Sequence, residues 1–182
     1  MPMSYSTYVE LTRPFLLKEH GLKPQRENDP GGQPYLLKTA LERRLYRVAP
    51  GWSMGQPVLI SITGDVIVMS GSMTIEGQTH GALGTGIIRH STNGNAAQDA
   101  QFVATAFKSA SSDILPRCAV LFGIGWYLKS IPADLKKRVV TWDGLRDYLA
   151  LVQSSWESAN ADVLRAVEKI AEAGQQKERR IS

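Results

Sequence analysis

The feature that most restricts the fold lies at 56–88, where short alternating apolar runs are separated by turn signals. Gly64-Asp65 and Glu76-Gly77 are the two turns, and each joins two such runs. Alternating runs joined by tight turns are typical of antiparallel strands. The segment therefore predicts a three-stranded antiparallel β-meander, which leaves one face and two edges to be covered.

The alternation also predicts which side chains share a face of this sheet. In the first strand, Val58, Ile60 and Ile62 are expected on one face. In the second strand, four apolar residues share a face with Gly71: Ile67, Met69, Met73 and Ile75. The third strand is the glycine-rich QTHGALGTGII. A helix has to cover the apolar face, and a neighbouring subunit could pair with an edge.

A long apolar helical pattern follows, from Gln98 towards Leu128. Its apolar residues recur at helical spacings: Ala100, Val103, Ala104, Phe107, Ala110, Ile114, Cys118, Leu121 and Phe122. Pro116 interrupts the pattern, because proline costs about 3 kcal/mol in a helix interior. Two interpretations stay open: one long helix that bends at Pro116, or a second helix that begins at an Asp113 cap. Either gives an α+β fold with a β-β-β-α core.

A short helix is predicted before the strands, at 35–49. Its apolar residues recur on one face of a 3.6-residue period: Leu37, Leu41, Leu45 and Val48. The basic residues of this helix lie outside that stripe: Lys38, Arg43, Arg44 and Arg47. Pro50-Gly51 ends the helix.

The most regular helical pattern is C-terminal, at 144–173. Spacings of four and three alternate without a slip: Leu145, Leu149, Val152, Trp156, Ala159, Val163, Ala166 and Ile170. This heptad seam predicts an amphipathic helix. The helix packs either on its own domain or on another chain, and the pattern leaves both interpretations open.

The organisation predicted from these patterns has three parts. Residues 1–34 contain five prolines and Gly31-Gly32, which predicts an extended N-terminal arm. Residues 35–143 form the core domain, and 144–182 form the C-terminal helix with a charged tail.

Basic charge is gathered in blocks along the chain. The formal net charge is +4, but the segment 51–107 holds one basic and three acidic residues. Three blocks lie outside that segment: Arg43, Arg44 and Arg47; Lys136, Lys137 and Arg138; Lys177, Arg179 and Arg180. Such blocks are either solvated surfaces or contacts for a polyanion such as nucleic acid.

Residues typical of catalysis are sparse. The chain has one cysteine, and its histidines, His20, His80 and His90, form no metal-binding pair. No glycine-rich loop is followed by the Lys-Ser/Thr of a phosphate-binding loop. We therefore predict a binding protein that needs no cofactor, no metal and no nucleotide; a nuclease is the enzymatic alternative. No apolar run reaches the ~20 residues of a membrane span, and no secretion signal is evident, so an intracellular protein is expected.

One stretch resembles a known family. Residues 104–132, ATAFKSASSDILPRCAVLFGIGWYLKSIP, closely resemble the signature of DdrA-type DNA damage response proteins. These are a bacterial branch of the Rad-fifty-two superfamily of single-strand annealing proteins. The FGIG-x-YL block at 122–128 is the specific part. Supporting similarities run in the same order over 11–143, at Pro14-Phe15, at Gly51-Trp52 and in the glycine-rich hairpin.

The chain departs from the family pattern at basic positions. A family Lys-Arg pair is Pro116-Arg117 here, and the arginine after FGIG is Trp126. The hairpin arginine falls at Thr79 or His80, whereas Lys108 is retained. These departures predict weaker DNA binding than that of other family members, or the use of other basic residues.

The resemblance implies a ring-forming protein that holds single-stranded DNA in a groove and anneals it without ATP, in DNA repair or recombination. Together with the charge blocks, it nominates twelve DNA-binding side chains: Lys38, Arg43, Arg44, Arg47, His80, Arg89, Lys108, Arg117, Lys129, Lys136, Lys137 and Arg138. The expected partners are single-stranded DNA and further copies of the chain, with no membrane. The expected location is the cytoplasm of a bacterium or a phage-infected cell, at the nucleoid. The alternative is a structural oligomer of the same fold with weak or no DNA binding.

Overall fold

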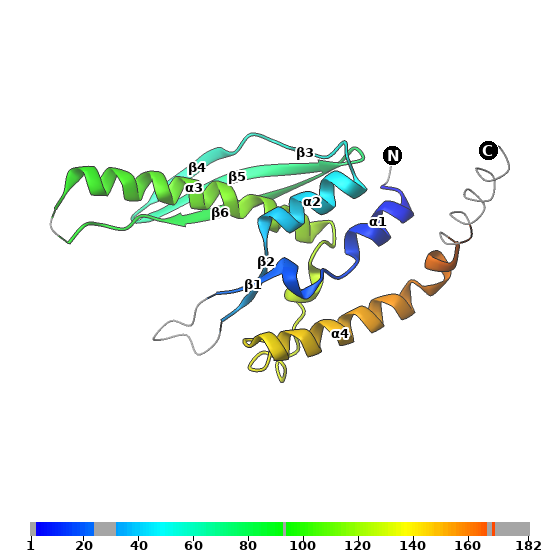
Figure 1. Ribbon diagram of the computed structural model, residues 1–182. Helices are drawn as coiled ribbons and strands as arrows, with labels where there is room; N and C mark the ends of the chain where they lie inside the picture. The colour runs from blue at the N-terminus through cyan, green and yellow to red at the C-terminus, as the bar shows by residue number, and fades with distance from the viewer. Residues whose placement is uncertain (1–2, 24–31, 93, 167–168, 170–182) are drawn as a thin grey trace, which may run out of the picture. The chain divides into compact units, whose positions relative to one another are not determined.

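The computed structural model describes residues 3–23, 32–92, 94–166 and 169 (Figure 1). The chain divides into two compact units. The sheet unit consists of Met1–Thr12 and Leu36–Trp126, and the helical unit of Arg13–Tyr35 and Tyr127–Ser182. Helices and antiparallel sheets are both present, so the mixed α+β class is confirmed.

The sheet unit is built on one antiparallel sheet. Its long strands are β4 (Val58–Thr63), β5 (Val66–Ile75) and β6 (Gln78–Ile87), and β5 lies between β4 and β6. A fourth strand, β3 (Ser53–Met54), also pairs with β5, so the sheet is larger than the predicted meander. Pro57 separates β3 from β4, since proline has no N–H for the strand ladder.

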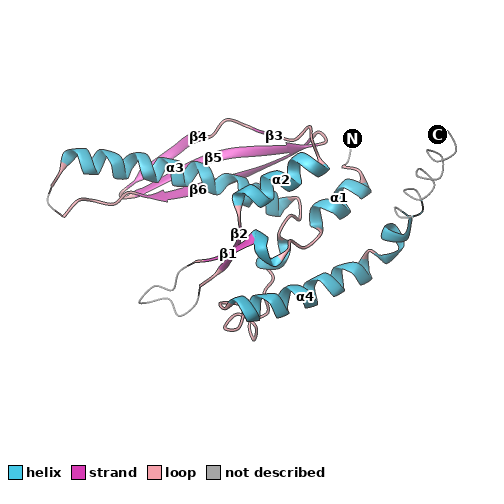
Figure 2. Ribbon diagram, viewed as in Figure 1, coloured by secondary structure: helices cyan, strands magenta, loops and turns pink. Residues whose placement is uncertain are grey.

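Helix α3 (Ala96–Leu121) packs against β5 and β6 (Figure 2). Ile67, Met73 and Ile75 of β5 are fully buried, as the predicted alternation requires. A Cβ atom at Gly84 would collide with the carbonyl of Ala110. Glycine in β6 therefore lets the helix backbone approach the strand closely.

α3 is one continuous helix through Pro116, which decides between the two interpretations of this segment. Ala110, Ile114 and Cys118 are fully buried, and their packing offsets the cost of a proline in the helix interior. The predicted extension towards Leu128 is wrong. Gly123 adopts a φ of 80°, in the left-handed region, and the helix ends before it.

The start of the chain differs from the predicted extended arm, because it begins with helix α1 (Tyr5–Thr12). Val9 and Leu11 are buried, and α1 packs on α2 (Lys38–Val48). The N-terminus of α1 is held by Glu76, whose carboxylate accepts hydrogen bonds from the Ser4 N–H and the Thr7 hydroxyl, both 2.6 Å long. This cap comes from the β5–β6 turn, so the local sequence of the arm does not reveal it.

α2 confirms a short helix within the predicted range 35–49, but the helix begins at Lys38 and residues 35–37 precede it. Leu41 and Leu45 are buried, as the apolar stripe requires, and Val48 is half-buried. The helix ends with Ala49 as its C-cap, just before Pro50-Gly51.

The helical unit contains α4 (Trp142–Ala159), the short 3₁₀ helix η1 (Leu17–Glu19) and a two-stranded sheet. That sheet pairs β1 (His20–Leu22) with β2 (Pro34–Leu36). A second 3₁₀ turn, η2 (Trp126–Leu128), lies where the two units meet in sequence.

The first half of the heptad seam is buried in the helical unit: Leu145, Leu149, Val152 and Trp156. The guanidinium of Arg13 lies 5.1 Å from the centre of the Trp156 ring. For these residues the structure favours packing on the chain's own domain. α4 ends at Ala159, which is exposed, so the predicted unbroken helix to 173 is not observed; Ile170 lies outside the described residues.

Candidate nucleic-acid interface

The arginines of α2 divide into two sets. Arg43 and Arg47 are exposed and four residues apart, so they lie on the same side of the helix. Neither forms an ion pair with another described residue. We call these two residues the arginine face. Arg44 is only 7% exposed and belongs to the interior of the sheet unit, not to this face.

Lys38 begins the same helix and lies 3.6 Å from Glu42. Exposed pairs of this kind contribute about 0–1 kcal/mol, so the ammonium can exchange its carboxylate for a phosphate at little cost. Lys38 and Arg47 are nine residues apart, so Lys38 projects to the opposite side of α2 from the arginine face.

The two basic residues of α3 do not share a face. Lys108 and Arg117 are nine residues apart, about two and a half helical turns, so they project to opposite sides. Arg117 Nε donates to Asp113 Oδ2 over 2.6 Å, and that oxygen also accepts from the Thr85 N–H at 3.4 Å. Asp113 thus holds the Arg117 guanidinium beside the edge of β6. Lys108 is exposed.

His80 and Arg89 belong to β6 and the segment after it. The His80 ring is half-buried and lies edge-on to the Phe122 ring, with centroids 4.5 Å apart. Arg89 is exposed. The neighbouring His90 Nε2 donates to Asp65 Oδ1 over 2.8 Å, and this hydrogen bond to the carboxylate raises the pKa of His90.

The remaining predicted residues lie in the helical unit. Lys129, Lys136, Lys137 and Arg138 are all exposed, and Arg138 Nη2 lies 3.9 Å from Asp147 Oδ2. The structure therefore assigns eight of the twelve predicted residues to the sheet unit and these four to the helical unit.

Strand β4 exposes apolar side chains along its whole length. Val58 and Ile60 are each 57% exposed, Leu59 is 44% and Ile62 is 51%. Ile62 pairs with Ile67 on the α3 side of the sheet, whereas Val58 pairs with Ser70 on the other side.

The prediction that Val58, Ile60 and Ile62 share a face is therefore wrong. The register of β4 shifts between Leu59 and Ser61, and a bulge of this kind moves the residues after it to the opposite face. The face away from α3 is also apolar at Val66, Leu83 and Ile87, and all three are exposed.

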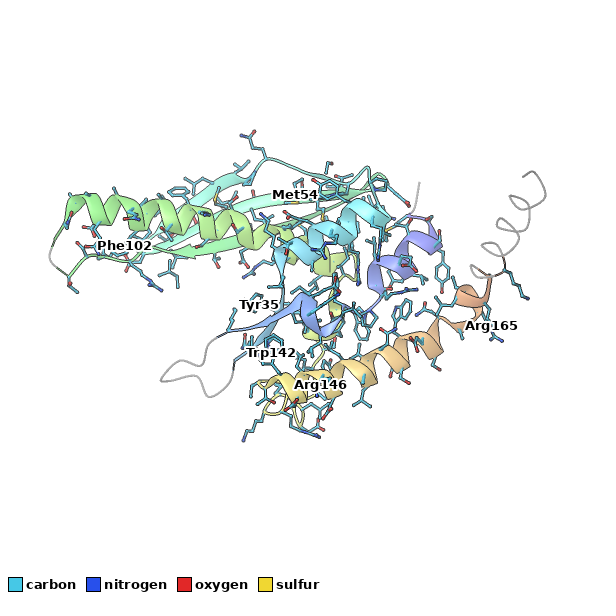
Figure 3. The ribbon with its side chains drawn as sticks, in the orientation of Figure 1. Tyr35, Met54, Phe102, Trp142, Arg146 and Arg165 are labelled. Carbon is cyan, nitrogen blue, oxygen red and sulfur yellow. The ribbon has the colours of Figure 1, made fainter. Side chains whose placement is uncertain are left out.

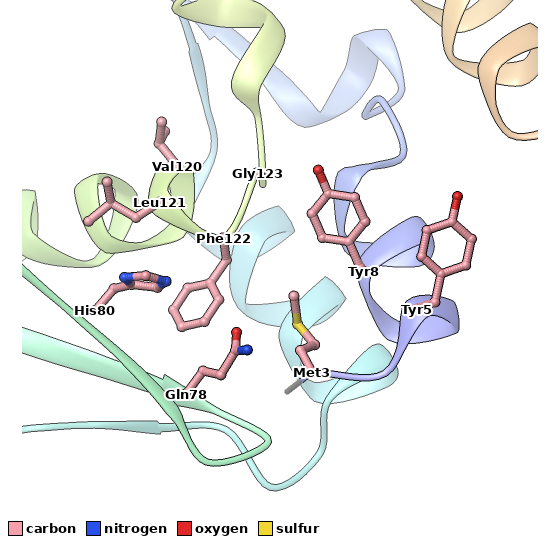
Figure 4. A pocket seen from close by; sticks show the side chains of 9 residues that line it. All are labelled: Met3, Tyr5, Tyr8, Gln78, His80, Val120, Leu121, Phe122 and Gly123. Atoms are coloured by element: carbon pink, nitrogen blue, oxygen red, sulfur yellow. The ribbon is translucent and has the colours of Figure 1, made fainter. Parts of the chain in front are cut away.

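A pocket of about 470 Å³ was not predicted (Figure 4). Its walls come from α1, β6 and the end of α3, all within the sheet unit. Tyr5 and Tyr8 stand on one side, and His80 and Phe122 on the other. We call this the aromatic pocket. Of its lining residues, only His80 is among the DNA-binding side chains predicted from the sequence. An isolated tyrosine in an irregular N-terminal segment carries no functional signal.

Few groups suited to metal binding or nucleophilic chemistry occur among the described residues. No three His, Cys, Asp or Glu side chains there are placed to hold a metal ion. Burial raises the pKa of the Cys118 thiol and keeps it in the less reactive protonated form. No helix within the described part of the chain is long and apolar enough to cross a membrane.

The sequence is similar to a known single-stranded DNA-binding protein. Over 108 residues, 59% of this chain, the sequence is 34% identical to the single-stranded DNA-binding protein DdrA of Deinococcus radiodurans. The match covers 43% of that relative, so the chain spans less than half of its length. No family model matches the chain. No solved structure matches it either.

Proposed function

We propose that the chain binds single-stranded DNA through its phosphates, with little sequence preference, and anneals complementary strands as a ring-forming oligomer in DNA repair or recombination. The observation that carries this proposal is the 34% identity over 108 residues with a relative named for single-stranded DNA binding. The resemblance of residues 104–132 to single-strand annealing proteins supports the annealing step. The proposal needs no nucleotide, metal or other cofactor.

The arginine face supplies the main electrostatic part of the proposal, and Lys38 adds a cation on the other side of α2. Arg43 and Arg47 are exposed guanidinium groups that form no ion pair with another described residue, so a phosphate would not have to displace a carboxylate from either of them. Lys108 and Arg117 would contact a strand only from different sides of α3. A single protomer thus offers few phosphate contacts, and we expect it to bind weakly.

Strand β4 supports assembly of several copies. Long exposed apolar edge strands are uncommon in monomeric proteins because they pair with other chains. β4 carries no charged residue to prevent such pairing. An oligomer built through β4 would multiply the weak phosphate contacts along one strand. In this proposal, assembly is a condition for tight DNA binding.

A salt series with a labelled thymidine oligonucleotide tests the proposal. We expect binding at low salt, and an affinity that falls with a log–log slope of about −0.7 for each phosphate contact. A duplex of equal length is the control and should bind less tightly. Fluorescence energy transfer between complementary strands, without ATP, then measures annealing. Absence of oligonucleotide binding at the lowest salt would refute the proposal.

A second candidate is a structural oligomer that does not contact DNA. It is favoured by the two departures in the family signature, Pro116 and Trp126. The Trp126 indole donates to the Thr12 carbonyl over 3.2 Å, so it serves the fold where the family has a cation. Sedimentation and nuclease protection separate the candidates. A protein that sediments as a defined oligomer but does not protect a single-stranded oligonucleotide from nuclease would favour this second function.

A further inference from the structure

The aromatic pocket exposes side chains that proteins usually bury. Tyr5 is 60% exposed and Tyr8 is 44% exposed, and they are three residues apart on α1, so they occupy neighbouring positions on the helix. Each presents a flat π-surface to solvent. Across the pocket, the His80 and Phe122 rings meet edge-on at 74° (Figure 4). The pocket is thus bounded by aromatic rings on two sides.

The lining of this pocket combines polar side chains, from Tyr5, Tyr8, Gln78 and His80, with apolar ones. None of its nine residues has a carboxylate, an ammonium or a guanidinium group. A phosphate would therefore find no fixed counter-charge inside. The Gln78 amide and the tyrosine hydroxyls supply both hydrogen-bond donors and acceptors. These features fit a flat, neutral ring with polar edges, which is the chemistry of a nucleobase.

The walls of the pocket are fastened to each other. Glu76 has a φ of 47°, in the left-handed region that non-glycine residues seldom adopt. Its carboxylate holds Ser4 and Thr7, and so ties α1 to the turn that leads into Gln78 of β6. Such strain persists where the surrounding structure requires it. Both sides of the aromatic pocket are therefore positioned before a ligand arrives.

The pocket also lies in the same unit as the arginine face. α1, which carries the two tyrosines, packs directly on α2, which carries Arg43 and Arg47. A DNA strand whose phosphates are bound on α2 would therefore be held by the same folded unit that contains the aromatic pocket.

Resting on the DNA binding proposed above, we infer that the aromatic pocket holds one unpaired nucleobase of the bound strand. Tyr5 and Tyr8 stack on the base, and Gln78 contacts its polar edge. Each protomer would then hold the sugar-phosphate chain by charge and one base by stacking.

Abasic oligonucleotides separate the base from the phosphate contribution, since they keep the charges and lack the rings. We expect the wild-type protein to bind a thymidine oligonucleotide at least about five-fold more tightly than an abasic one of equal length, the lower end for stacking of one base. The variant Tyr5→Leu/Tyr8→Leu should lose this difference and keep its affinity for the abasic strand. Tyr35→Leu is the matched control, because Tyr35 is 41% exposed and lies in the helical unit.

The outcomes distinguish this inference from the proposed function. Binding of neither oligonucleotide refutes the DNA-binding function itself. Equal binding of both by the wild type, or a thymidine preference that survives in the tyrosine variant, overturns only the pocket assignment. If the tyrosine variant fails to assemble and the wild type shows no preference for the thymidine strand, the pocket is a protein contact. That result would also overturn the inference that the pocket holds a base. Photo-crosslinking with an iodouracil oligonucleotide should label Tyr5, Tyr8 or His80, and labelling confined to other residues would contradict the inference.

Discussion

The phenol of Tyr127 connects separate segments of the helical unit through buried hydrogen bonds. It accepts from the Phe15 N–H at 3.2 Å and lies 2.8 Å from His20 Nε2. His20 Nδ1 lies 2.9 Å from the Leu16 carbonyl, which can only accept, so Nδ1 carries the proton. In the neutral form of the ring Nε2 is then the acceptor, and the Tyr127 hydroxyl donates to it.

Tyr127→Phe would remove both of these hydrogen bonds while keeping the ring. A buried hydrogen bond contributes about 0.5–1.5 kcal/mol net, so we expect the free energy of unfolding to fall by about 1–3 kcal/mol. Urea denaturation measures the change. Tyr35→Phe, at a partly exposed tyrosine of the same unit, should change stability by less than about 0.5 kcal/mol. Equal effects of the two substitutions would contradict the assigned role of the Tyr127 hydroxyl.

The arginine face makes a prediction that is independent of overall affinity. If Arg43 and Arg47 each neutralise one phosphate, each alanine substitution should reduce the salt slope by about 0.7. Arg146→Ala is the control, because Arg146 is exposed on α4 and lies 2.8 Å from Asp143 (Figure 3). Anisotropy titrations at several salt concentrations give the slopes. Unchanged slopes for Arg43→Ala and Arg47→Ala would exclude these residues as phosphate contacts.

At the scale of secondary structure, α1 depends on one carboxylate from the β5–β6 turn. The hydrogen bonds from Thr7 and Ser4 lower the pKa of Glu76 below its ordinary value of 4.5. A group whose pKa is lowered by folding stabilises the folded state above its unfolded pKa. That contribution is lost as the pH falls through the lower, folded value. The anchor of α1 is therefore complete at neutral pH and fails only in acid.

Glu76→Gln should loosen α1 at neutral pH, because the amide keeps one acceptor and loses the charge. We expect faster hydrogen exchange of the α1 amides than in the wild type, and the same exchange in Glu157→Gln as in the wild type. In the wild type, α1 protection should decline below pH 4.5, whereas the variant should show no such step. Wild-type protection of α1 in Glu76→Gln would contradict the capping role.

The elements found from the sequence are those whose stability is local. The 3.6-residue period predicts α2 and α3, and the two-residue alternation predicts β5, because each pattern reflects burial of its own segment. The two turn signals then place β4 and β6 on either side of β5 in the sequence. α1 was missed because its cap comes from Glu76, about seventy residues away. The change of face between Val58 and Ile62 was missed because a bulge leaves no local signal.

The candidate site, too, was predicted only as far as local sequence patterns allow. Charge blocks identify exposed arginines such as Arg43, but they do not show that Arg44 is buried. α1 packs on α2, so the buried side of α2 is wider than its apolar stripe predicts. The aromatic pocket could not be predicted, since Tyr8 and Phe122 are brought together only by the tertiary fold.

At the scale of the whole molecule, the proposed function depends on how many protomers bind one DNA strand together. A protomer with a few phosphate contacts binds a strand weakly, but linked copies bind one strand at a high effective concentration. The exposed apolar strand β4 is the part of the sheet unit suited to linking them. Assembly and DNA affinity should therefore change together when β4 is altered.

Ile60→Lys tests this coupling, because Ile60 is 57% exposed and a charge on an edge strand opposes pairing with another chain. We expect the wild type to sediment as an oligomer and the variant as a smaller species with weaker DNA binding. Leu151→Lys is the matched control, since Leu151 is 61% exposed on α4. It should keep both assembly and affinity. An Ile60→Lys protein that remains assembled would show that β4 is not needed for oligomer formation. A monomeric wild type would show that no oligomer forms, so that the weak contacts of one protomer would have to account for any DNA binding.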